Sequence, residues 1–188
     1  MQTPQPKIEI KAISIKEHYE AISTLMRGLH GNEHDLFDKT ANWDDIEKNY
    51  MQHVIEMQEE CEGTCLVAFS NQQAVGFIFG YLEEQDESRI EVYTGNELYV
   101  SDGYVLPEFR RQGIYRKMNE MLEDIYIKKG VRRMTRFTLV NNENMQQFLQ
   151  SSGYEATRIL YEKWLTDEGK SNYDEHHKES IKDVIILP

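Results

Sequence analysis

The stretch Tyr104-Val105-Leu106-Pro107-Glu108-Phe109-Arg110-Arg111-Gln112-Gly113-Ile114-Tyr115-Arg116 carries the strongest structural signal in the sequence. A β-rich run ends at Pro107, which offers no amide to a sheet ladder. A short basic turn containing Gly113 then leads into a run of apolar residues at helical spacing. The first amides of a helix have no intrahelical partners, and a glycine lets an anion approach the backbone closely. The stretch therefore predicts either an anion-binding turn or a solvated, arginine-rich helix start, in both cases with charge from Arg110, Arg111 and Arg116.

The patterns on either side of this turn predict one domain over residues 1–165, followed by an extension at 166–188 that is either an extra strand or a loose tail. A capping box at Ser14-Ile15-Lys16-Glu17 starts the first helix, and Gly31 is expected to end it. Strands are expected at 7–13, 64–69, 74–82, 133–140 and 154–165, with further strand structure within 89–94 and 97–106, and the other helices are 43–60, 113–129 and 143–152. The order β-α-α-β-β-β-α-β-α-β, with hairpins first and then a strand-helix-strand crossover, predicts an α+β fold with a mixed sheet.

Composition narrows the classes of partner. The 188 residues carry 33 acidic and 21 basic side chains, for a net charge of −12. Such a charge argues against nucleic-acid binding and mildly favours cationic small molecules. There is no apolar run of membrane-spanning length and no signal-peptide pattern, and the two cysteines cannot form a disulfide framework. We therefore expect a cytoplasmic protein with no membrane partner.

One motif suggests a metal. His30-Gly31-Asn32-Glu33-His34 matches the His-x-x-Glu-His pattern of some zinc hydrolases, which requires a continuous helix. Gly31-Asn32 indicates a helix end at this point, so a loop is favoured and no metal site is predicted. Cys61 and Cys65 lack a second pair of ligands at zinc-binding spacing.

Taken together, these motifs resemble the GNAT (GCN5-related N-acetyltransferase) superfamily over residues 7–165. Arg110 and Gly113 match its Arg/Gln-x-x-Gly-x-Gly/Ala signature, whereas Tyr115 stands where the family prefers Gly or Ala. The hairpin at 66–80 resembles the family's second and third strands. Asn142, eleven positions before Gly153-Tyr154, resembles a second family motif.

The resemblance implies acetyl-CoA as co-substrate and two central strands that splay apart to hold it. The pantetheine arm would pair with the backbone of Tyr104, Val105 and Leu106. The pyrophosphate would lie on the turn and helix start, and the implied binding residues are Arg110, Arg111, Gln112, Gly113, Ile114, Tyr115, Arg116 and Asn142. An acceptor amine would attack the thioester directly. Homodimers are frequent in the family.

The catalytic acid and base of the family are not obvious here. Leu149 stands where a tyrosine often protonates the leaving thiolate, and Ser101 stands where a glutamate often acts as base. The nearby carboxylates Asp102 and Glu97 are the candidate bases, although Asp102 also fits a strand-end acid and Glu97 an exposed strand start. A hydroxyl such as that of Tyr99 or Tyr104 could supply the proton.

Three functions are therefore open. The leading hypothesis is an N-acetyltransferase that moves an acetyl group from acetyl-CoA to a primary amine of a small molecule or peptide. The first alternative is a CoA-binding sensor or interaction module of the same fold with weak catalysis. The second is a zinc hydrolase built on His30 and His34.

Overall fold

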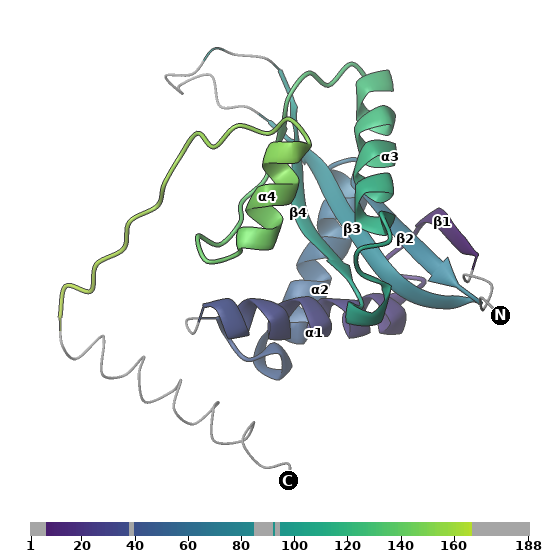
Figure 1. Ribbon diagram of the computed structural model, residues 1–188, viewed down its shortest axis with the longest axis horizontal. Helices are drawn as coiled ribbons and strands as arrows, with labels where there is room; N and C mark the ends of the chain where they lie inside the picture. The colour runs from purple at the N-terminus through teal and green to yellow at the C-terminus, as the bar shows by residue number, and fades with distance from the viewer. Residues whose placement is uncertain (1–6, 38–39, 85–91, 93–94, 167–188) are drawn as a thin grey trace, which may run out of the picture. The chain divides into compact units, whose positions relative to one another are not determined.

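A computed structural model describes residues 7–37, 40–84, 92 and 95–166 (Figure 1). The chain divides into two compact units. The first comprises the residues up to Asn32 together with Trp43–Phe137, and the second comprises Glu33–Asn42 together with the residues from Thr138 onward. The first unit contains the whole sheet and most of the helical residues, so it is the frame for the candidate site.

The sheet of the first unit has five strands in the order β1-β2-β3-β4-β5. Their bounds are Ile8–Ile13, Thr64–Ser70, Gln73–Glu83, Glu97–Val105 and Met134–Thr135. The first four strands are antiparallel neighbours, and β5 pairs with β4 in parallel. The crossover between β4 and β5 runs through a helix, as a parallel pair requires. The predicted α+β fold with a mixed sheet is confirmed.

Helices cover both faces of this sheet. The helices α1 (Tyr19–Leu36) and α2 (Trp43–Glu60) pack their apolar stripes on one face, around Val67, Phe77 and Phe79. The helix α3 (Ile114–Lys128) packs Met118, Leu122 and Tyr126 on the other face, against Leu66, Ile78 and Val100. Figure 1 shows α1 and α2 together on one side of the strands and α3 on the other. Because side chains alternate between the two faces along each strand, they pack into two separate hydrophobic cores.

The splay expected of the two central strands is present. The strand β4 continues to Val105, but its pairing with β5 is confined to Leu98 with Met134 and Tyr99 with Thr135. Beyond Tyr99 the two strands diverge, so the predicted strand at 133–140 shrinks to two residues. A separation of this kind exposes one edge of β4 from Val100 onward to whatever fills the gap.

The second unit contains α4 (Glu143–Ser151), whose first turn is capped by the Oδ1 atom of Asn142 accepting from the Met145 amide at 3.1 Å. The strand predicted at 154–165 is absent, and this part of the chain is irregular. Its apolar side chains Ile159, Leu160 and Tyr161 are exposed. A run of strand-forming residues stays irregular where no neighbouring strand pairs with it. The strand predicted at 89–94 and the extension beyond Thr166 lie outside the described residues.

The first helix does not end at Gly31. It continues without a break to Leu36. A Cβ atom placed on Gly31 would meet nothing within 4 Å, so the glycine lies on the exposed side of the helix and costs it only about 1 kcal/mol. In the described part of the chain, no helix is long and apolar enough to cross a membrane.

Candidate active site

A β-bulge in β4 shapes the centre of the site. Phe79 and Gly80 are consecutive on β3, but they pair with Asp102 and Val100 on β4, so Ser101 is an extra residue without a partner on β3. A bulge shifts the alternation of side chains by one position. Leu98 and Val100 point to the α3 face before the bulge, and Val105 does so after it. The shift turns Asp102 toward α1 and α2.

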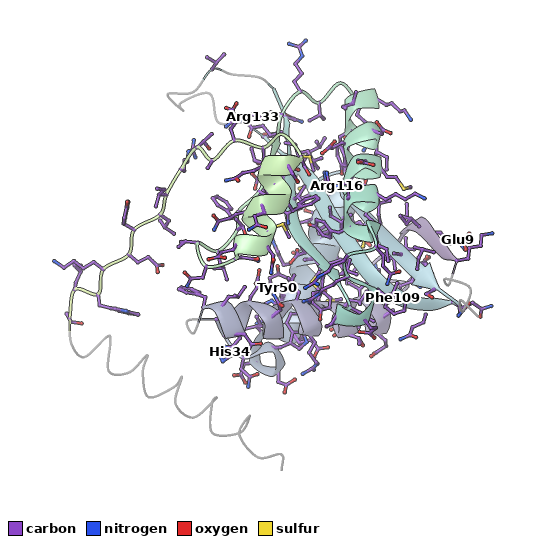
Figure 2. The ribbon with its side chains drawn as sticks, in the orientation of Figure 1. Glu9, His34, Tyr50, Phe109, Arg116 and Arg133 are labelled. Carbon is purple, nitrogen blue, oxygen red and sulfur yellow. The ribbon has the colours of Figure 1, made fainter. Side chains whose placement is uncertain are left out.

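Asp102 is a buried carboxylate held by two hydroxyl groups. Only 3% of it is exposed. The Tyr50 hydroxyl donates to its Oδ1 atom at 2.6 Å, and the Ser101 hydroxyl donates to its Oδ2 atom at 2.6 Å. Figure 2 places Tyr50 between the helix pair and the sheet. Burial raises the pKa of Asp102, and these two hydrogen bonds partly oppose the rise.

Three rings lie together beside this carboxylate. The centroid of His30 is 4.7 Å from that of Trp43 and 5.4 Å from that of Tyr50, and Trp43 lies 5.9 Å from Tyr50. Burial lowers the pKa of His30, and the nearby Asp102 opposes that change. The Nδ1 atom of His30 and the Nε1 atom of Trp43 are buried and have no hydrogen-bond partner among the described residues. Both are polar atoms that a ligand could satisfy.

The basic turn leads into α3 without a side-chain cap. Gly113 is the N-cap residue, with φ of 76°, and a glycine has no side chain with which to cap the first amides of the helix. Arg111 also has positive φ, at 62°. The turn is exposed from Arg110 to Gly113, whereas Ile114 is buried in the α3 core. A Cβ atom on Gly113 would meet nothing within 4 Å, so the space at the helix start is open.

The side chain of Arg110 turns back toward the end of β4, and its predicted contact with the coenzyme stays a prediction. Its Nε atom donates to the Val105 carbonyl at 2.9 Å, and its guanidinium lies 5.2 Å from the centre of the Tyr104 ring. One Nη atom also approaches Asn32 of α1 at 3.5 Å. Arg110 thus closes the turn onto the end of β4. Arg111, Arg116 and Lys117 are exposed cations of this turn and helix start, and Figure 2 labels Arg116.

Tyr115, the departure from the family signature, lies over β4. A Cβ atom on Gly103 would come within 2.6 Å of the Tyr115 hydroxyl, so the ring rests directly on this glycine. Arg136, which follows β5, donates from Nη1 to the same hydroxyl at 2.7 Å. The Nε atom of Arg136 is buried without a hydrogen-bond partner among the described residues. These residues bridge the first turn of α3 and the chain after β5.

The other candidate base, Glu97, has a different environment from the one predicted. The sequence suggested an exposed strand start, but only 3% of Glu97 is exposed. Its Oε1 atom lies 2.9 Å from Nη1 of Arg133, and this ion pair offsets the cost of burying the carboxylate. Glu97 is the first residue of β4, several positions from the bulge. Of the two candidates, the geometry favours Asp102.

In the second unit, Asn142 is the N-cap of α4, and Leu149 lies in the same helix, half-buried. We did not predict the capping role of Asn142 from the sequence, although an Asn one residue before a helix is a common signal for it. Its predicted contact with the coenzyme stays a prediction.

The metal motif does lie on a continuous helix, contrary to our sequence interpretation, because α1 passes through Gly31. Yet no group of three or more His, Cys, Asp or Glu side chains that could hold a metal ion occurs among the described residues. His30 packs between aromatic rings, and His34 approaches the Thr40 hydroxyl at 2.9 Å.

Residues 30–154 match the model of the acetyltransferase (GNAT) family. The match spans most of the chain and includes the turn, the bulged strand and α4. The chain belongs to the GNAT acetyltransferase family. The predicted resemblance is thereby confirmed.

Solved structures of GNAT proteins have the same fold. The chain is 19% identical to the aminoglycoside N-acetyltransferase AAC(6')-Iy, solved in complex with CoA, with a TM-score of 0.63 over 88% of this chain and 100% of that one. It is 17% identical to AAC(6')-Ih from Acinetobacter baumannii, with a TM-score of 0.62 over 85% and 99% of the two chains. A putative acetyl transferase from Pyrococcus furiosus is 16% identical, with a TM-score of 0.66 over 85% and 100%. At these identities the likeness establishes the GNAT fold alone.

Sequence reasoning missed several residues of the site, namely Tyr50, His30 as a ring partner, and Arg136. Tyr50 and Asp102 are 52 positions apart, and no local pattern links them. The bulge did leave a signal, because the apolar alternation through Leu98 and Val100 changes phase before Val105. That change of phase predicts an extra residue in this GNAT strand.

Proposed function

We propose that this chain is an acetyl-CoA-dependent N-acetyltransferase that acts on a primary amine of a small molecule or peptide. The observation that carries the proposal is the start of α3, a fifteen-residue helix whose N-cap residue is a glycine in the left-handed conformation, with open space around it. A 3-10 turn at Pro107–Phe109 and the basic turn connect it to β4, the strand whose pairing with β5 ends at Tyr99. Membership of the GNAT family supports the same reaction.

The residues present fit the co-substrate. The first amides of a helix have no intrahelical partner, and they lie at the positive end of the helix dipole, so a helix start of this kind favours a phosphate group. Gly113 leaves open space there, and Arg111 and Arg116 add exposed positive charge. The edge of β4 beyond Tyr99 pairs with no further strand of the described residues, and it can supply backbone groups for the amides of a pantetheine arm. These features support binding of the pyrophosphate at the turn and of the arm along β4.

Asp102 is our candidate for the general base. A carboxylate with a raised pKa takes a proton from an ammonium group more readily than an ordinary aspartate does. In the reaction the neutral amine attacks the thioester carbonyl carbon, a C–N bond forms and the C–S bond breaks. Coenzyme A leaves as a thiolate that takes up one proton. The acceptors named for the AAC(6') relatives are aminoglycosides, which supports an amine acceptor here.

Two measurements on the full chain test the proposal. Acetyl-CoA should raise the melting temperature, because a ligand that binds only the folded state stabilises it, by about 2.7 kcal/mol at a hundredfold excess over the dissociation constant. Free thiol should then appear when a panel of primary amines is added. No melting shift at millimolar acetyl-CoA would refute the proposal. A shift without thiol release on any amine would instead favour the CoA-binding module.

A further inference from the structure

Two carboxylates are buried in the described part of the chain, and they differ in the groups that contact them. Glu97 is ion-paired with Arg133, whereas Asp102 accepts from two neutral hydroxyls, and the described groups His30 and Arg136 act on its charge only from beyond salt-bridge distance. A buried carboxylate without a paired cation is costly for folding. Such a group commonly marks a place where a ligand supplies the missing charge.

This carboxylate lies one side chain below the surface. Its two hydroxyl partners, Tyr50 and Ser101, are half-buried rather than buried, as are His30 and Tyr99 nearby. A small cation that reaches these hydroxyls is therefore separated from the Asp102 carboxylate only by the hydroxyl groups that bond it. The rotation of a hydroxyl group is enough to exchange one of its hydrogen bonds for a contact to an ammonium group.

The surroundings of Asp102 are aromatic rather than acidic. His30, Trp43 and Tyr50 contact one another on the helix side. On the strand side, the rings of Tyr81 and Tyr99 are 5.5 Å apart, and Tyr99 lies 5.9 Å from the exposed ring of Phe137. Aromatic faces attract a cation and also pack against an apolar body, particularly once water has been excluded.

Two carboxylates near the start of α2, those of Asp44 and Glu47, are already engaged, and Asp45 in the same turn is exposed. Arg27 of α1 forms ion pairs with both Asp44 and Glu47. A polycationic ligand needs several carboxylates, each placed opposite one of its ammonium groups. Among the described buried groups, Asp102 alone can serve in this way, so the site matches a single positive charge.

We propose that the acceptor of this enzyme is a monoamine with an apolar or aromatic body, whose ammonium group binds at Asp102 and whose body packs against the surrounding rings. This inference rests on the proposed acetyl transfer and narrows its substrate class. The Asp102 carboxylate takes one proton from the ammonium group, and the neutral amine nitrogen then bonds to the acetyl carbon. Coenzyme A leaves with the electron pair of the C–S bond, and its sulfur takes up the second proton that the nitrogen loses. The buried nitrogen atoms of His30 and Trp43 are positioned to bond a polar substituent of the same ligand.

Thiol release with acetyl-CoA should be compared for 2-phenylethylamine, spermidine and neamine, at matched ionic strength. We expect kcat/KM for 2-phenylethylamine to exceed that for either polycation at least tenfold. Equal or better use of spermidine or neamine would overturn the inference and leave the transfer activity standing. Failure of all three amines would also overturn the inference. The proposed function itself would be removed by a missing melting shift with acetyl-CoA, or by the absence of thiol release across the whole panel of primary amines.

A set of variants distinguishes the loss of a ring contact with the acceptor from a general loss of stability. Tyr50→Leu and His30→Leu should each raise KM for 2-phenylethylamine about tenfold with less effect on spermidine, whereas Tyr50→Phe keeps the ring and should keep the preference. Tyr19→Leu removes another half-buried tyrosine of the same helix pair and is the matched control. Each variant is first checked for its melting shift with acetyl-CoA. If the leucine variants bind acetyl-CoA and keep the preference unchanged, the rings do not select the acceptor.

Discussion

The Tyr115 hydroxyl accepts a hydrogen bond from Nη1 of Arg136 at 2.7 Å, and the guanidinium carbon lies 5.8 Å from the centre of the Tyr115 ring. The contact joins the first turn of α3 to the segment after β5. It crosses the region where β4 and β5 part, with Gly103 beneath the ring. A residue that departs from the family signature thus has a structural role: it connects the two elements that border the proposed coenzyme site.

Replacing this hydroxyl should weaken the fold. Tyr115→Phe keeps the ring on Gly103 but leaves the half-buried Arg136 without this acceptor, so we expect the free energy of unfolding to fall by about 1–2 kcal/mol. Urea denaturation measures the change. Tyr161→Phe, at a tyrosine that is 87% exposed, is the control and should have no effect. Equal values for the two variants would mean that the Arg136 bond contributes nothing.

Two glycines of α1 should respond oppositely to alanine. A Cβ atom on Gly28 would lie 2.7 Å from Cε1 of Tyr104, whereas one on Gly31 would meet nothing within 4 Å. Gly28→Ala must displace a packed ring and should cost about 1–3 kcal/mol. Gly31→Ala should stabilise the helix by about 0.5–1 kcal/mol. Thermal unfolding of both variants checks this, and a stabilised Gly28→Ala would show that Tyr104 moves freely.

The proposed anion site at the start of α3 can be tested by substituting two glycines, one at each end of this helix. Gly113 and Gly130 both have positive φ, of 76° and 85°, and a Cβ atom placed on either would meet nothing within 4 Å. An aspartate therefore strains the backbone similarly at either site. Gly113→Asp places a negative charge where we propose that phosphate binds, and calorimetry should show at least tenfold weaker acetyl-CoA binding. Gly130→Asp should bind almost as the unmodified protein does. Equal loss in both would place the phosphate elsewhere.

The raised pKa of Asp102 predicts where activity is lost on the acidic side of the pH profile, which is its acid limb. If the carboxylate form is the base, kcat/KM should fall as pH decreases through the pKa of Asp102. That fall should occur above the usual range for an aspartate, because burial raises the pKa. Asp102→Asn should lower kcat by about 10²–10⁴-fold and remove this limb. A variant with full activity and an unchanged pH profile would exclude Asp102 as the base.

The same substitution has an opposite effect on stability. A carboxyl group whose pKa is higher in the folded state than in the unfolded state binds its proton more tightly when folded. Its stabilising effect is complete at low pH and is lost as pH rises through the folded-state pKa. Asp102→Asn should therefore match the unmodified protein at acidic pH and become relatively more stable toward pH 7. Melting temperatures measured across this range give the comparison.

Local signals predicted the elements that depend on neighbouring residues. The turn at 110–113 and the helix after it agree with the structure to within a residue, because the proline, the glycine and the apolar stripe act over short distances. Gly31 is the exception: a typical stop signal lies inside α1, where a glycine on the exposed side costs little.

Features that depend on distant partners could not be predicted. The length of β5 follows from where β4 diverges from it, and the irregular path of 154–165 follows from the lack of a strand beside it among the described residues. Asp102 was a candidate on sequence alone, but its burial and its bond to Tyr50 depend on packing between α2 and β4. Glu97 was expected to be exposed, because Arg133 could not be recognised as its partner from the sequence.

The bulge at Ser101 also limits how residue roles can be transferred between relatives. Counting along β4 from Glu97 assigns side chains correctly only as far as Val100, and counting back from Val105 is correct only as far as Asp102. If a homologue lacks the extra residue, an ungapped alignment across this point pairs Asp102 with a side chain of the opposite face. Such an alignment places Ser101 opposite the catalytic residue of the homologue, although in the structure it is Asp102 that occupies that position. Superposition of the strands, rather than residue numbering, is the sound basis for such comparisons.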